Sequence, residues 1–125
     1  MNTKFSELPW HDAELFAVII DRRSPGENDQ VVINVRWPNG EQDSLIFSDC
    51  YALEAKMNFG VIAPESILNA SLVNESKELT EIREKWARTG IDLQNLKCFE
   101  IETNSTASLL RIYSLSYSKV RGGLP

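Results

Sequence analysis

The pair of residues with the most evident chemistry is His11-Asp12, which contains the only histidine of the chain. An imidazole beside a carboxylate is the pairing that general-base catalysis uses. Adjacent side chains on an extended chain point to opposite faces, however, so Asp12 is poorly placed to orient its own neighbour. We therefore interpret Trp10-His11-Asp12 as a corner that leads into a strand, with the Asp12 carboxylate accepting backbone N–H groups.

The two cysteines, Cys50 and Cys98, lie far apart in the sequence. Either thiol could be a nucleophile with His11 as its base. Asp49 would raise the pKa of the neighbouring Cys50 thiol, and free cysteine is most often a small buried hydrophobic residue. Two distant cysteines also make neither a disulfide framework nor a zinc motif. We predict no catalytic residue and no metal ligand.

Cofactor and nucleic-acid motifs are equally scarce in the sequence. The glycines are isolated except for Gly122-Gly123 in the C-terminal tail, so no glycine-rich phosphate loop is expected. The basic pair Arg22-Arg23 and the basic residues near Arg83 are interleaved with acidic ones, and no basic stripe results. We expect no cofactor and no nucleic-acid partner.

The charge balance is acidic, with 18 acidic and 13 basic side chains and a formal net charge of −5. Ordinary solvated faces account for such charges, and an acidic patch that steers a basic protein partner is the functional alternative. Tyr113 and Tyr117 are expected to share one strand face, and tyrosine is favoured at interfaces, although core packing explains both equally well. The acids that would form the patch recur along a predicted helix and on a strand: Glu75, Glu78, Glu81, Glu84, Glu100 and Glu102.

A length of 125 residues with 42% hydrophobic residues predicts a single domain over residues 1–125. Residues 1–7 and 121–125 are expected to be loose ends. No apolar run approaches the roughly 20 residues that cross a bilayer, and the first residues lack the apolar core of a signal peptide. We expect a cytoplasmic protein with no membrane partner.

Alternating apolar residues predict most of the strands. Glu14 to Arg22 is apolar on both faces at its centre, as in a central strand. Residues 31–37 and 42–47 flank the turn Pro38-Asn39-Gly40 and form a hairpin. Further strands are predicted at 51–59, where a helical stripe is the alternative, at 96–103 and at 110–117, the last two joined by the turn Asn104-Ser105-Thr106.

Two helices are predicted between these strands. Pro64 fits the first position of a short helix that ends at Ala70. A long helix runs from Asn74 or Ser76 to Thr89, and Gly90 ends it. The predicted fold class is α+β, a mostly antiparallel sheet with the two helices packed on one face.

Three segments together resemble small uncharacterised bacterial proteins, some of which resemble immunity proteins of polymorphic toxin systems. The segments are residues 10–15 (WHDAEL), residues 47–60 (FSDCYAL to MNFG) and residues 102–108 (ETNSTAS). The resemblance implies a small, non-catalytic bacterial α+β protein, and in the immunity case one that blocks a toxin by binding it. It implies no catalytic residues.

The hypothesis favoured by the sequence is a non-enzymatic binding protein that acts by stoichiometric occlusion of a partner. One alternative is a small-ligand-binding protein or enzyme with a pocket near His11 and Asp12. Another is a homo-oligomeric structural subunit, for which a homodimer is the simplest case. The residues expected to contact a ligand or partner are Trp10, His11, Asp12, Asn104, Ser105, Thr106, Tyr113 and Tyr117.

Overall fold

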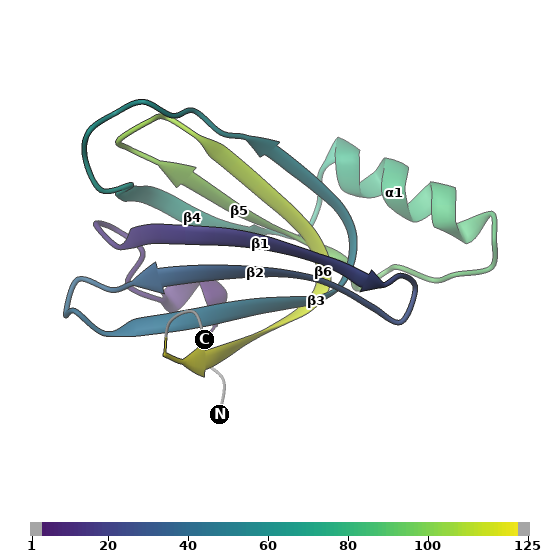
Figure 1. Cartoon of the computed structure of the whole chain (residues 1–125). Coiled ribbons are helices and arrows are strands. Elements are labelled where there is room, and N and C mark those ends of the chain that lie inside the picture. The colour runs from purple at the N-terminus through teal and green to yellow at the C-terminus, as the bar shows by residue number, and fades with distance from the viewer. Residues whose placement is uncertain (1–3, 123–125) are drawn as a thin grey trace.

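Six antiparallel strands form one sheet in a computed structural model that describes residues 4–122 (Figure 1). The strand order across the sheet is β1-β2-β3-β6-β5-β4. A 3-10 turn, η1, precedes β1, and the helix α1 lies between β4 and β5. The elements are η1 (Phe5–Glu7), β1 (Glu14–Ser24), β2 (Asn28–Arg36), β3 (Gln42–Lys56), β4 (Ile67–Val73), α1 (Lys77–Ala87), β5 (Lys97–Thr103) and β6 (Leu109–Arg121).

The hairpin of β2 and β3 confirms the prediction made from alternation and turn residues. Val31, Ile33 and Val35 are buried along one face of β2. Gly40 has φ 90° and its N–H donates to the carbonyl of Trp37 at 2.8 Å, which closes the turn. The strand predicted at 51–59 is confirmed as far as Lys56, and its helical alternative is wrong, because β3 continues through both predicted segments as one strand.

The two edge strands, β1 and β4, meet at one end of the sheet. The Leu15 N–H donates to the Glu65 carbonyl at 2.8 Å, and the Ile67 N–H donates to the Ala13 carbonyl at 2.7 Å. We call this the closed end. Beyond Leu15, no backbone hydrogen bond joins β1 to β4 within residues 4–122, so the sheet stays open at its other end, where the β1–β2 turn and α1 lie (Figure 1).

The prediction that the first strand is central is therefore wrong, since β1 is an edge strand. Its apolar residues on both faces led to that expectation. The structure buries Leu15 in the core but leaves Phe16 and Ile20 exposed.

The main core lies on the inner face of the curved sheet and is closed by η1. Phe5 is only 2% exposed, and its ring lies 4.8 Å from that of Trp10 and 5.0 Å from that of Phe99. The expectation of a loose end over residues 1–7 is thus wrong for Phe5–Glu7, because an aromatic side chain in the core fixes the segment; residues 1–3 lie outside the described residues. At the other end, β6 continues to Arg121, and residues 123–125 are likewise outside them.

The helix α1 confirms the long helix predicted from the sequence. Ser76 caps it by accepting a hydrogen bond from the Leu79 N–H at 3.1 Å, and Gly90 follows its end with φ 84°. Leu79 packs into a second cluster on the outer face of the sheet, with Leu96 and Tyr113. The helix therefore lies on the face opposite the main core.

The short helix predicted from Pro64 to Ala70 is wrong. Ile67–Val73 is strand β4, which pairs with β5, and the residues just before it pair with the start of β1. Backbone pairing on both sides outweighs the preference of Pro64 for a helix start. The fold is consequently mostly β, with one α-helix among the described residues.

Candidate partner-binding surface

The corner Trp10-His11-Asp12 lies at the closed end. Trp10 is buried, and its Nε1 donates to the Phe5 carbonyl at 2.6 Å. His11 Nδ1 lies 3.3 Å from the Leu68 carbonyl oxygen, and the ring is largely exposed. Asp12 has φ 67°, a turn conformation and not an extended one, and its carboxylate lies 3.7 Å from His11 Nε2.

The predicted role of the Asp12 carboxylate as an acceptor of backbone N–H groups is not seen among its hydrogen bonds within residues 4–122. The backbone N–H of Asp12 instead donates to the Ile67 carbonyl at 3.1 Å. The corner is thus held by its backbone, and both polar side chains face solvent.

The turn Asn104-Ser105-Thr106 binds the segment that precedes β4. Ser105 Oγ donates to the Pro64 carbonyl at 2.6 Å and accepts from the Ser66 N–H at 3.1 Å. Thr106 donates its hydroxyl to the Glu65 carboxylate, and the Asn104 N–H donates to the Ser66 carbonyl at 2.7 Å. These polar groups have internal partners. A neighbouring hollow is lined by Leu68, Glu102, Thr103, Ala107, Ser108, Leu109 and Arg111. Its lining therefore includes none of residues 104–106 and neither His11 nor Asp12.

The same turn supports a loop of uncharged residues between β3 and β4. We call residues 57–64 (MNFGVIAP) the apolar loop. Asn58 fixes its start, since its Nδ2 donates to the carbonyls of Thr106 at 3.0 Å and Ala107 at 3.1 Å. Phe59 is 88% exposed, Ile62 is fully exposed, and Val61 is half exposed. The loop presents three large apolar side chains to solvent from a base that is held at both sides.

Sequence reasoning missed the apolar loop because Met57 and Phe59 extend the alternation of the preceding strand. A usable signal was present: Gly60 and Pro64 interrupt the segment, and no charged residue lies between Lys56 and Glu65.

Tyr113 and Tyr117 do not share a face, contrary to the prediction. Tyr113 is buried under α1, and its hydroxyl donates to Glu54 Oε1 at 2.5 Å. Burial, followed by this hydrogen bond, raises the pKa of Tyr113. Tyr117 packs against Phe5, Phe47 and Phe99 on the inner face. Ile112 and Tyr117, five residues apart on β6, both pack in the main core, so the alternation of this strand is interrupted between them. The pairing of β3 with β6 shifts register in the same region, between Cys50 and Ala52.

A groove at the open end was not predicted at all. It has a volume of about 690 Å³ and lies between the β1–β2 turn, the middle of β3 and the end of α1. Its apolar lining includes Ile20, Tyr51, Leu53, Trp86 and Ile91. The rings of Tyr51 and Trp86 meet edge to face, with centroids 5.1 Å apart. The charged residues that line the groove are Asp21, Arg22, Glu27, Asp29 and Asp49.

The acids of the groove differ in their pairing. Asp21 binds the Arg23 guanidinium at 2.8 Å, and this hydrogen bond holds the pKa of the carboxyl at about 2. Glu27, Asp29 and Asp49 have no ion-pair partner within residues 4–122. Asp29 Oδ2 does accept a hydrogen bond from the Gly26 N–H at 3.0 Å. We call these three the unpaired acids of the groove.

Cys50 lines the groove, and its thiol is hard to ionise. Burial, with smaller contributions from the charges of Asp29 and Asp49, raises the pKa of Cys50 to about 11. Burial likewise raises the pKa of Cys98 to about 11. Both thiols are therefore protonated at neutral pH, which makes them poor nucleophiles.

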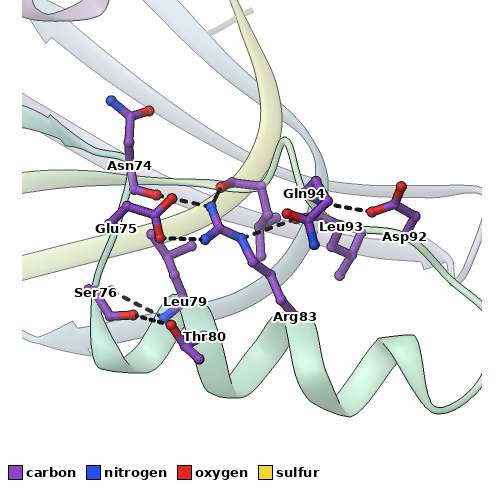
Figure 2. Close-up of polar contacts among 10 residues, drawn as sticks. Asn74, Glu75, Ser76, Leu79, Thr80, Arg83, Asp92, Leu93 and Gln94 are labelled. Atoms are coloured by element: carbon purple, nitrogen blue, oxygen red, sulfur yellow. Dashed lines mark hydrogen bonds and ion pairs between the residues drawn. The ribbon is translucent and has the colours of Figure 1, made fainter.

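The Arg83 guanidinium on α1 contacts the chain on both sides of the helix (Figure 2). Its Nη2 donates to the carbonyls of Asn74 at 2.9 Å and Leu96 at 2.8 Å, and its Nε donates to the Leu93 carbonyl at 3.2 Å. Nη1 also pairs with the Glu75 carboxylate at 2.9 Å. One guanidinium thus ties the segment before the helix to the segment after it.

Within residues 4–122, no group of three His, Cys, Asp or Glu side chains is arranged to hold a metal ion. No helix in the same range is long and apolar enough to cross a membrane. In comparisons with known proteins, no protein-family model matches the chain, and no curated protein matches it.

Proposed function

We propose that this protein is a non-enzymatic binding protein that blocks a protein partner by stoichiometric occlusion, in the manner of an immunity protein. The proposal includes the cytoplasm as its compartment. The observation that carries it is the apolar loop, whose side chains Phe59, Val61 and Ile62 are exposed within four consecutive residues.

Exposed apolar residues are common singly, but a cluster of large ones marks an interaction site. A phenylalanine and an isoleucine that leave water on binding are each worth about 1.5–3 kcal/mol of transfer free energy. Such anchors, seated in a pocket of the partner, carry most of the binding energy of an interface.

The anchoring of the apolar loop favours binding further. Asn58 on one side and the Ser105 contacts on the other hold the base of the loop before any partner arrives. A loop already in its bound shape loses less conformational entropy on association, so more of the contact energy appears as affinity.

The experiment compares the full chain with a double variant, Phe59→Ser with Ile62→Ser, as bait in bacterial lysate. A partner retained by the wild type and lost with the double variant is then purified and titrated by calorimetry. We expect a one-to-one complex that the double variant weakens at least about 100-fold, since two anchors of roughly 1.5–3 kcal/mol are removed.

The matched control is Val120→Thr, which alters a half-exposed apolar residue on β6, away from the loop. It should leave the affinity unchanged. Retention of the same partner by the loop double variant at unchanged affinity would refute the proposal. Self-association of the wild type that the loop variant abolishes would favour the homo-oligomeric subunit instead.

A further inference from the structure

The groove at the open end has the dimensions of a ligand site. Its volume of about 690 Å³ lies inside the roughly 300–1,000 Å³ usual for pockets that enclose a ligand. Trp86 and Tyr51 stand edge to face on its lining, and Leu53 and Ile91 extend the apolar surface. An occupant must therefore bring hydrocarbon as well as polar groups.

The negative charge of the groove favours an occupant that carries a positive charge. Glu27, Asp29 and Asp49 line it without an ion-pair partner among the described residues, against the single cation Arg22. Arg23 is already bound to Asp21. Asp29 and Asp49 line the same groove as Cys50, and their charges both contribute to the raised pKa of its thiol. A negative concave site concentrates cations.

The apolar lining narrows the class of cation. A bare metal ion would need several oxygen or nitrogen ligands at one point, and no such group exists within residues 4–122. Arginine and lysine carry a charge at the end of a hydrocarbon stem, which lies along apolar surface while the charged head meets the acids. Arginine also stacks on tryptophan and tyrosine rings and is weakly hydrated.

We propose that the groove receives an arginine or lysine side chain of a protein segment, with the stem against Trp86 and Tyr51 and the charge between Asp29 and Asp49. The inference rests on the proposed function in taking the natural ligand to be a protein. The groove is then a second contact surface, at the end of the sheet opposite the apolar loop. The partner is basic where it meets this groove.

The test titrates a hexa-arginine peptide into the full chain, with hexa-citrulline as the uncharged probe of the same length. Tryptophan fluorescence reports the groove, because Trp10 and Trp37 are only 4% exposed and Trp86 is the remaining tryptophan. We expect a fluorescence change with hexa-arginine that Trp86→Phe abolishes, and none with hexa-citrulline.

The decisive variant is Asp29→Asn with Asp49→Asn. Asparagine keeps an oxygen that can accept the Gly26 N–H at position 29, and it tolerates the φ of 54° at position 49, so the fold is retained. We expect the peptide affinity to fall about tenfold, since each exposed ion pair is worth up to about a factor of five.

The matched control is Glu78→Gln with Glu81→Gln, which changes the net charge equally on exposed residues of α1 that do not line the groove. It should change the affinity by less than about twofold. Equal weakening by both double variants, or equal binding of hexa-citrulline, would overturn the proposal.

The apolar-loop double variant separates this inference from the proposed function. If it binds hexa-arginine normally and loses the captured partner, both proposals stand. If it keeps both, the proposed function fails and the groove remains a cation site. If hexa-arginine leaves the wild-type fluorescence unchanged while the loop variant still loses its partner, only the inference about the groove fails.

Discussion

The two ends of the sheet differ in how their polar groups are partnered. At the closed end, the hydroxyls of Ser105 and Thr106 and the indole N–H of Trp10 bond within the chain. At the open end, Glu27, Asp29 and Asp49 line the groove with no ion-pair partner within residues 4–122. The hydroxyls of Ser105 and Thr106 therefore stabilise the closed end, whereas three acids that line the groove at the open end lack an ion-pair partner.

This contrast indicates which parts of a small β protein are available to bind a partner. A polar group that already has an internal partner gains little from a ligand, whereas an acid without an ion-pair partner can form one with a bound cation. In the proposed function, the closed end contributes through the apolar loop that its hydrogen bonds hold in place, and the open end contributes through charge.

The largest effect on stability should follow from truncating a core side chain at the closed end. Phe5→Ala removes a ring that is 2% exposed and contacts Trp10, Phe47, Phe99 and Tyr117. We expect a loss of about 3–5 kcal/mol in the free energy of unfolding, measured by urea denaturation. A loss below about 1 kcal/mol would show that η1 does not close the core.

The next effect should come from the open end, where Arg83 supports α1. Arg83→Met keeps much of the stem but removes the donors to the carbonyls of Asn74, Leu93 and Leu96. We expect a loss of about 2–3 kcal/mol, since hydrogen bonds to charged groups are among the stronger ones. Hydrogen exchange should accelerate in α1 before it accelerates in β2.

A smaller effect is expected where the turn supports the apolar loop. Ser105→Ala leaves the Pro64 carbonyl and the Ser66 N–H without their side-chain partner. The cost should be about 1–2 kcal/mol, with faster amide exchange at residues 58–66. Asn104→Ala is the control, because the hydrogen bond from Asn104 to Ser66 uses its backbone N–H. Equal losses for both variants would contradict a role for the Ser105 hydroxyl.

Removing a charge from the groove should not destabilise the protein. Asp49→Asn relieves repulsion among unpaired acids, and asparagine accepts the positive φ at this position. We expect a change of between zero and about 0.5 kcal/mol toward higher stability. The gain should shrink at high salt, because screening removes the repulsion in the wild type as well. A clear loss of stability would mean that Asp49 has a structural role like that of Ser105.

The smallest effect is expected at His11. Its side chain is 75% exposed, and its Nδ1 lies 3.3 Å from a single carbonyl oxygen. His11→Ala should change the free energy of unfolding by less than about 0.5 kcal/mol and leave partner affinity unchanged. Lost binding at an unchanged melting temperature would place His11 in the interface and would make the closed-end corner a recognition site.

Local patterns predicted much of the fold. Pro38-Asn39-Gly40 located the β2–β3 turn, and Ser76 with Gly90 marked the limits of α1, because turn and cap geometry depend on a few neighbouring residues. The segment at Pro64 was mispredicted for the opposite reason: its strand state depends on pairing with β5 and, at its start, with Ala13 and Leu15, all far away in the sequence. Pairing over such a separation leaves no periodic signal.

The candidate surfaces were harder to foresee. The groove combines residues from β1, the β1–β2 turn, β2, β3, α1 and the segment after α1, and none of these segments carries a motif of its own. The apolar loop was concealed because its first residues continue a strand-like alternation. Trp10, in contrast, was predicted as a contact residue and is buried, since an aromatic ring that can reach a core is more stable there.

The hydrogen bonds at the base of the apolar loop have a consequence for how such a protein can diversify. They run through the backbone and through Asn58, Ser105 and Thr106, and none of these bonds involves Phe59, Val61 or Ile62. If the protein acts as proposed, substitutions at the three tip positions can therefore change which partner is bound while the scaffold keeps its shape. Selection for a new target need not first solve a folding problem.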